Sequence, residues 1–134
     1  MSRGWGFAIR LLAVAAALGA CALLAGCGRQ AKAERMAAMA TGGDPGRGRA
    51  LIHQYGCVSC HTIPGVEGTH TIVGPPLAGI ATRTYIAGVL VNQPDNMVRW
   101  IRNPPAVDSL TAMPFMGVTE RDARDIASYL YTLQ

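Results

Sequence analysis

Two cysteines and a histidine stand close together in the run CVSCH at residues 57–61. Two thiols three residues apart can add across the two vinyl groups of one haem, and the thioether bonds then anchor the ring. His61 directly follows the second thiol, so its imidazole comes to lie under the iron as an axial ligand. In a secreted chain this spacing predicts covalent haem attachment through Cys57 and Cys60.

Two other uses of these residues fit the sequence less well. A structural zinc site would need two further cysteine or histidine ligands at defined spacing. Only His53 and His70 remain, in a poor pattern, and we expect both to be solvated. A redox disulfide would need a surrounding strand–helix–strand pattern, which is absent, and would leave His61 without a role.

The sixth iron ligand would decide what the haem does. Met113 follows a helix that Pro104 and Pro105 stop, and it lies in a loop from which a thioether can reach the face opposite His61. Met97 falls on a helix face and reads as core, because methionine fills irregular gaps. Met116 is the competing ligand, and we expect Met113 to be the one that binds.

The start of the chain has the pattern of an export signal. Arg3 and Arg10 precede an uninterrupted apolar stretch at residues 11–26, which predicts a signal peptide over residues 1–26. The stretch ends in LAGC, which resembles the lipobox of bacterial lipoproteins and predicts lipidation of Cys27. The alternative is an ordinary signal peptide with Cys27 as a bystander. Lipidation would place the protein on the periplasmic side of a bacterial membrane.

Residues 27–43 are rich in alanine, arginine and glycine, so we expect a lipid anchor and flexible tether there, followed by one domain at 44–134. Without Arg3 and Arg10, ten basic residues face eight acidic ones, which gives no indication of a nucleic-acid partner. A domain of this size buries a limited core by itself. A bound cofactor would supply much of the missing apolar interior.

Helical periodicity dominates the domain. Asp44 and Pro45 predict a helix start, and Gly56 its end. We expect further helices at 83–89, 95–102 and 119–133, the last with Thr119 as its N-cap and an apolar stripe at Ala123, Ile126, Ala127, Leu130 and Leu133. We expect residues 62–77 to form a loop. No segment of the domain has the alternation of apolar and polar residues that would predict a β-strand. The sequence therefore predicts an all-α domain.

Residues 44–134 resemble the class I cytochromes c. The resemblance rests on the order of a helix, CVSCH, a GPPL loop, a helix ending in NP, a methionine loop and a final helix with a Tyr-Leu pair. It implies the cytochrome c fold, with three to four helices wrapped around one covalently bound haem c. His61 matches the proximal ligand. Gly48 matches a glycine that lets the first and last helices cross closely.

The same resemblance implies roles for other residues. The Pro75 carbonyl should accept a hydrogen bond from the proximal imidazole, which fixes its tautomer. Arg83 should lie near a haem propionate, with a solvated surface arginine as the alternative. Trp100 should pack beside the axial methionine and donate at most one hydrogen bond. The spacing from the NP pair supports Met113 as that methionine, and Phe115 should shield the haem edge.

With both axial positions filled, the expected task is outer-sphere transfer of single electrons, without a small-molecule substrate. The expected partners are redox proteins such as a terminal oxidase, a bc1-type complex or a periplasmic dehydrogenase. The mature chain has a single lysine, Lys32, so docking should rest on an apolar patch at the haem edge. One alternative is a permanently bound subunit through which electrons enter an oxidase or dehydrogenase complex. Another is a haem enzyme or gas sensor, if Met113 does not bind iron.

Overall fold

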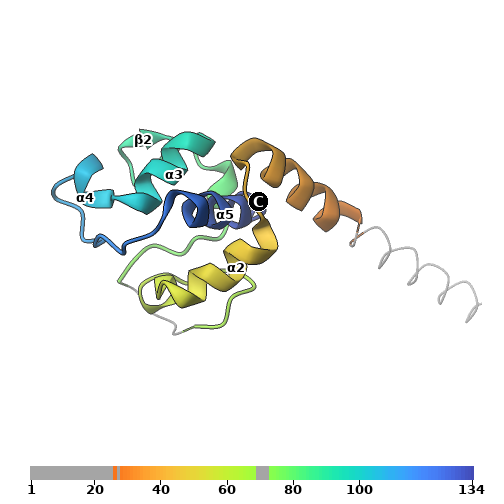
Figure 1. Cartoon of the computed structure of the whole chain (residues 1–134), viewed down its shortest axis with the longest axis horizontal. Helices are drawn as coiled ribbons and strands as arrows, with labels where there is room; N and C mark the ends of the chain where they lie inside the picture. The colour runs from red at the N-terminus through yellow and green to blue at the C-terminus, as the bar shows by residue number, and fades with distance from the viewer. Residues whose placement is uncertain (1–25, 27, 69–72) are drawn as a thin grey trace, which may run out of the picture. The chain divides into compact units, whose positions relative to one another are not determined.

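The computed structural model describes residue 26 and residues 28–68 and 73–134 (Figure 1). Ala33–Gln134 form one compact unit. Cys27 and all but the last residue of the expected signal peptide lie outside the described residues, so the predictions made for them stay predictions. Within the described part of the chain, no helix is both long and apolar enough to cross a bilayer.

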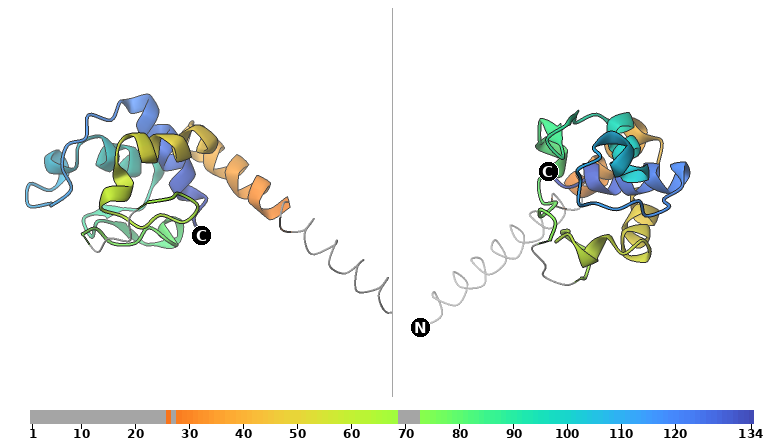
Figure 2. Two further views of the ribbon diagram at one scale, coloured as in Figure 1. Left: turned by 90° about the horizontal axis from the view of Figure 1, so that it is seen from below. Right: turned by 90° about the vertical axis from the view of Figure 1, so that its left-hand side faces the viewer.

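Two helices that are far apart in the sequence, one near each end of the domain, cross each other in the structure. Helix α2 spans Pro45–Gln54, and the side chain of Asp44 accepts a hydrogen bond from the Arg47 amide to cap it. Helix α5 spans Glu120–Tyr131, with the Thr119 hydroxyl accepting from the Asp122 amide. Both starts were predicted from these capping residues. Figure 2 shows the two helices from further directions.

The crossing is close because Gly48 has no side chain. A Cβ atom at Gly48 would lie 1.9 Å from the carbonyl oxygen of Asp125 on α5. Polar groups frame this contact. The Arg47 guanidinium donates to the carboxylates of Asp122 and buried Asp125, and the Tyr55 hydroxyl donates to Asp122 at 2.8 Å. This ion-pair network, which the sequence did not predict, holds α2 on α5.

Helix α3 spans Pro94–Arg102 and packs on α5, as the helix predicted at 95–102. Its buried side chains include Met97, Val98, Trp100 and Ile101. A one-turn helix, α4, follows at Pro104–Val107 where a loop was expected. The Asn103 side chain caps this helix by accepting a hydrogen bond from the Ala106 amide. Prolines are tolerated in the first turn, because an N–H group at these positions would have no partner within the helix.

The prediction of a helix at residues 83–89 is wrong. A 3-10 turn, η2 (Ile80–Thr82), is followed by a two-stranded antiparallel hairpin of β1 (Tyr85–Ile86) and β2 (Leu90–Val91). Ala87 and Gly88 both have positive φ, at 51° and 77°, which reverses the chain and is incompatible with a right-handed helix. The strands are too short to change the all-α class.

The segment expected to be a flexible tether, residues 27–43, is helical over most of its described length. Residues 28–41 are helical, and from Ala33 onward they belong to the same compact unit as the rest of the domain. The alanine-rich composition explains the helix, since alanine has the best intrinsic propensity. The sequence lacks a broad apolar stripe in this segment, which is why its packing was missed.

Tyr131 gives the domain a pH-dependent contact near its C-terminus. Its hydroxyl donates to Asn92 Oδ1 at 2.7 Å, and Nδ2 of the same Asn92 side chain donates to the carbonyls of Ile80 and Arg83. Burial raises the pKa of Tyr131 to about 12. The unfolded chain therefore loses this proton first, so stability contributed by Tyr131 is complete below pH 10 and falls between pH 10 and 12.

We expect Tyr131→Phe to cost about 1 kcal/mol at neutral pH, the usual net value of a lost hydrogen bond. Urea unfolding should then show a smaller stability loss between pH 10 and 12 in the variant than in the parent. Parallel losses in both proteins would contradict the assignment of this pH dependence to Tyr131.

Candidate haem-binding site

One cavity of about 670 Å³ lies between the helices and the CVSCH segment. This volume is within the roughly 300–1,000 Å³ of small-molecule and cofactor pockets. Its walls are mainly apolar, and come from α2, α3, α5 and the intervening loops. The larger aliphatic and thioether side chains among them include Ile52, Ile63, Leu77, Ile80, Ile86, Met97, Ile101, Met113, Met116, Val118, Ile126 and Leu130.

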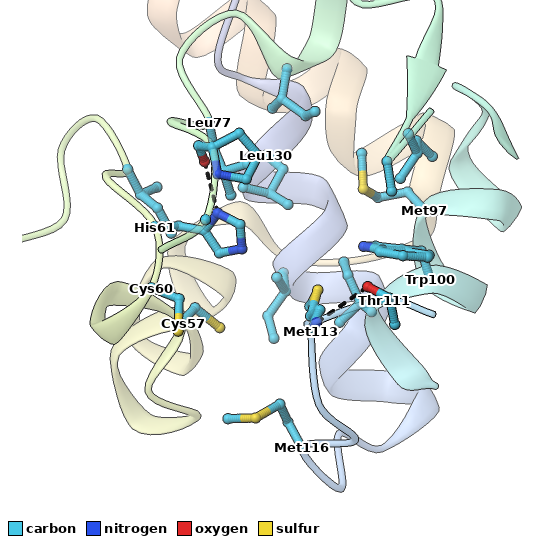
Figure 3. Close-up of a pocket in the computed structure, with 18 of the residues that line it drawn as sticks. Cys57, Cys60, His61, Leu77, Met97, Trp100, Thr111, Met113, Met116 and Leu130 are labelled. Atoms are coloured by element: carbon cyan, nitrogen blue, oxygen red, sulfur yellow. Dashed lines mark hydrogen bonds between the residues drawn. The ribbon is translucent and has the colours of Figure 1, made fainter. Parts of the chain in front are cut away.

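The haem motif forms one wall of the cavity. Gly56 ends the segment after α2 with a left-handed φ of 70°, and the 3-10 turn η1 (Cys57–Ser59) begins directly after it. The His61 amide donates to the Cys57 carbonyl at 3.0 Å, which closes the turn. Figure 3 shows the two cysteines below His61 on the same side of the cavity. Burial raises the pKa of the Cys57 thiol, as expected in an apolar wall.

The His61 imidazole is oriented by the loop that follows. Its Nδ1 atom lies 2.8 Å from the Pro75 carbonyl oxygen, which can only accept, so Nδ1 carries the hydrogen. The other ring nitrogen points into the cavity (Figure 3). The hydrogen bond expected from the GPPL loop is therefore present. It leaves the histidine in the tautomer that a metal ligand requires.

Gly74 fits flat against the same imidazole. A Cβ atom at this position would lie 2.5 Å from His61 Cε1. Either the ring or the loop that carries the Pro75 carbonyl would have to move to admit it. Gly74 thus sets the position of His61 from one side while Pro75 sets it from another.

We expect Gly74→Ala to weaken the bond between His61 and iron and to lower stability by about 1–3 kcal/mol, the usual cost of overpacking. Holoprotein yield, the absorption spectrum and urea unfolding would measure this. Pro76→Ala is the matched control, since Pro76 is exposed in the same loop. A Gly74→Ala holoprotein with the spectrum and stability of this control would contradict the role given to Gly74.

Met113 lies on the opposite side of the cavity from His61, beside Trp100 (Figure 3). The Met113 amide donates to the hydroxyl Oγ1 of Thr111, two residues earlier in the loop, at 3.2 Å. This hydrogen bond anchors the backbone of Met113. Trp100 is 8% exposed and also lines the cavity. Met116, the competing thioether, lines it as well, nearer the cysteine side in Figure 3. The structure thus brings His61 and Met113 to facing walls.

Phe115 does not shield this cavity, contrary to expectation. Its side chain is 63% exposed and lines a separate hollow with Arg99 and Arg102. The loop turns its neighbours inward instead, because Met113 and Met116 occupy the cavity wall on either side of it. Simple spacing could not show which of the four consecutive apolar loop residues at 113–116 would face solvent.

Arg83, which the resemblance places near a haem propionate, lines the cavity. Its Nη2 atom donates to the carbonyls of Pro76 at 2.5 Å and Ala78 at 3.0 Å. The guanidinium therefore holds the loop that follows Pro75, and its role toward a propionate stays a prediction. His53 is exposed, as expected, and His70 lies outside the described residues.

The residues of this cavity fit a covalently attached haem. Two cysteines line one wall, a correctly oriented imidazole stands above them, a thioether faces it, and most of the remaining lining is apolar. Sequence reasoning found all four of these residues. It missed Thr111 as the anchor of Met113, although a threonine two residues before a loop position is a common side-chain-to-backbone motif.

Comparison with known proteins agrees with this site. The chain is 33% identical over 89 residues to cytochrome c oxidase subunit 2 of Alkalihalophilus pseudofirmus, a match that covers 66% of this chain. The chain spans only 25% of that protein's length. The sequence profile of the cytochrome c family matches residues 46–134, which contain the haem motif, the GPPL loop and Met113. The chain therefore belongs to the cytochrome c family, whose members carry covalently bound haem c and transfer electrons.

Proposed function

We propose that this protein is a monohaem class I cytochrome that carries single electrons by outer-sphere transfer. The observation that supports this most is the pair of His61 and Met113 on facing walls of one mainly apolar cavity, with Cys57 and Cys60 on the side of His61 (Figure 3). Haem bound there would supply a one-electron iron couple. With both axial positions filled by protein, no small molecule could coordinate the iron. The chain contains a single C-x-x-C-H motif, which supports one haem.

The protein's own groups would tune this site. The Pro75 carbonyl holds His61 in one tautomer, and Thr111 holds the backbone of Met113. The apolar lining excludes water, and a thioether ligand favours the reduced state of iron. Ligands that stay in place in both oxidation states keep the structural change on electron transfer small.

Carbon monoxide separates this function from that of a haem enzyme or gas sensor. The reduced wild-type holoprotein should not bind carbon monoxide at neutral pH, as followed by its absorption spectrum. Rapid, stoichiometric binding would contradict a closed iron site and would favour the enzyme or sensor.

We further propose that lipid on Cys27 anchors the cytochrome to the periplasmic side of a bacterial membrane. The basic start, the apolar stretch at 11–26 and the LAGC sequence support this. Labelled fatty acid should be incorporated into the wild type but not into Cys27→Ser, and only the wild type should sediment with membranes. A membrane-bound Cys27→Ser variant would contradict the lipid anchor.

The first possibility is a free carrier that visits its partner, which can be a terminal oxidase, a bc1-type complex or a periplasmic dehydrogenase. The second possibility is a permanent subunit of such a complex, and the similarity to an oxidase subunit favours it. Purification in mild detergent distinguishes the two. A stable partner in one-to-one ratio would indicate a fixed subunit, whereas a monomeric cytochrome would indicate a carrier.

A further inference from the structure

The helix ahead of the family-matched region is part of the folded domain. Ala37 is 4% exposed and Thr41 is 1% exposed, one helical turn apart on the same face. Met36 and Met39, by contrast, are exposed. A mobile tether would leave both faces open to solvent. The asymmetric burial indicates that residues 33–41 are docked.

Specific contacts fasten the end of this helix to α5. Arg124 Nη1 donates to the Thr41 carbonyl at 3.1 Å. A Cβ atom at Gly43 would lie 2.2 Å from the Arg124 carbonyl oxygen, so the two backbones touch there. The Asp44 amide then donates to the buried carboxylate of Asp125 at 2.7 Å. The chain is therefore held on α5 at three consecutive points before α2 begins.

Thr41 makes the helix end where these contacts require it. Its hydroxyl donates to the Ala37 carbonyl at 2.9 Å and accepts from the Gly43 amide at 3.2 Å. Gly42 follows with a left-handed φ of 69°, the usual way for a helix to stop. Helix end, turn and α2 cap form one continuous hydrogen-bonded segment over residues 41–44.

We propose that residues 33–41 are a fixed N-terminal helix of the cytochrome domain, joined to α2 by a turn at residues 42–44, and that only residues 28–32 separate the domain from the lipid on Cys27. This inference rests on the proposed lipidation of Cys27. A spacer of 28–32 reaches about 20 Å when fully extended, whereas a free chain from Cys27 to Gly43 would reach about 55 Å. A domain of this size has a radius of gyration of about 13 Å.

The spacer is therefore shorter than the domain is wide. The cytochrome would stay against the membrane surface and could not swing between distant partners. Its partner would be a redox protein embedded in the same membrane, with the docking surface close to the lipid headgroups. A soluble partner that needs the haem cavity exposed far from the membrane would not suit this arrangement.

Docking of the helix can be tested without any lipid. Hydrogen–deuterium exchange on the full-length holoprotein in detergent should show amides 37–41 protected about 100-fold or more relative to an unstructured chain. Ala37→Glu should abolish most of this protection and open Arg35 to trypsin, while the haem spectrum stays unchanged. Ala40→Glu is the matched control, since Ala40 is exposed on the same helix. Unprotected wild-type amides, or equal effects of the two substitutions, would overturn the proposal.

The reach is tested in vesicles of phosphatidylethanolamine and phosphatidylglycerol that carry a headgroup fluorophore. Haem in the wild-type lipoprotein should quench this dye strongly, and ten Gly-Ser residues inserted after Lys32 should reduce the quenching measurably. Equal quenching would overturn the short spacer. If fatty-acid labelling shows no lipid on Cys27, the anchor itself fails, while the exchange result still decides whether the helix is docked.

Discussion

Replacing Met113 with alanine should make the reduced protein bind carbon monoxide rapidly and stoichiometrically, where the wild type binds none. The substitution removes the thioether that faces His61 across the cavity (Figure 3). Iron bound there would then keep His61 as a protein ligand and would have a position open to carbon monoxide. The reduction potential should fall, because the ligand that favours reduced iron is gone. Stability should drop by about 2–5 kcal/mol, the usual cost of truncating a methionine in a packed site.

Met116→Ala is the matched control, since Met116 lines the same cavity three residues further along the same loop. This variant should keep the weak red absorption band that ferric haem shows while a thioether is bound, and should not bind carbon monoxide. The opposite result, with an open iron in Met116→Ala and a closed one in Met113→Ala, would make Met116 the ligand. An open iron in neither variant would remove methionine ligation from the proposed site.

The sequence predicted the parts of the site that depend on local chemistry. The CVSCH spacing, the GPPL loop and the capping residues Asp44 and Thr119 act over a few residues, so their meaning does not depend on distant parts of the chain. Each of these segments lies where it was expected. The close crossing of α2 and α5 at Gly48 was implied by the resemblance to the class I cytochromes c, and the structure has the close approach there.

The predictions failed where long-range packing decides the structure. Residues 83–89 have no strong helical pattern, and the positive φ values of Ala87 and Gly88 arise within a turn that the sequence signals only through one glycine. Phe115 faces solvent, whereas Met113 before it and Met116 after it line the cavity. The tether became a docked helix because small residues, Ala37 and Gly43, fit closely on the domain. Small side chains leave little hydrophobic signal to detect.

Replacing Gly48 with alanine should be the most destabilising single-methyl change in the domain. The added carbon would lie 1.9 Å from the Asp125 carbonyl oxygen and 2.5 Å from its carbon. Both are backbone atoms of α5, so no side chain can rotate away and the helices must separate. Overpacking of this kind costs about 1–3 kcal/mol and occasionally more.

Separation of the helices would also disturb the contacts around the crossing. Arg47 bonds to Asp122 and Asp125, and the Asp44 amide bonds to Asp125, all across the same interface. The weakening of these contacts adds to the cost of overpacking, so a total loss near the upper end of that range, about 3 kcal/mol, is expected. Lower yield of holoprotein should accompany this loss, because α2 leads into the haem motif and α5 lines the cavity.

Gly46→Ala on the same helix provides the control for Gly48→Ala. Gly46 is exposed, and a Cβ atom there would meet only the Asp44 carboxylate at 3.2 Å, an atom of a side chain that can shift. Alanine also has the better helix propensity, by about 1 kcal/mol, so this variant should stay within about 1 kcal/mol of the wild type in urea unfolding. Both substitutions add the same methyl to the same helix, so the difference between them isolates the crossing. If the two variants unfold at the same urea concentration, α2 and α5 do not need the close approach at Gly48, and the haem cavity is held together by other contacts.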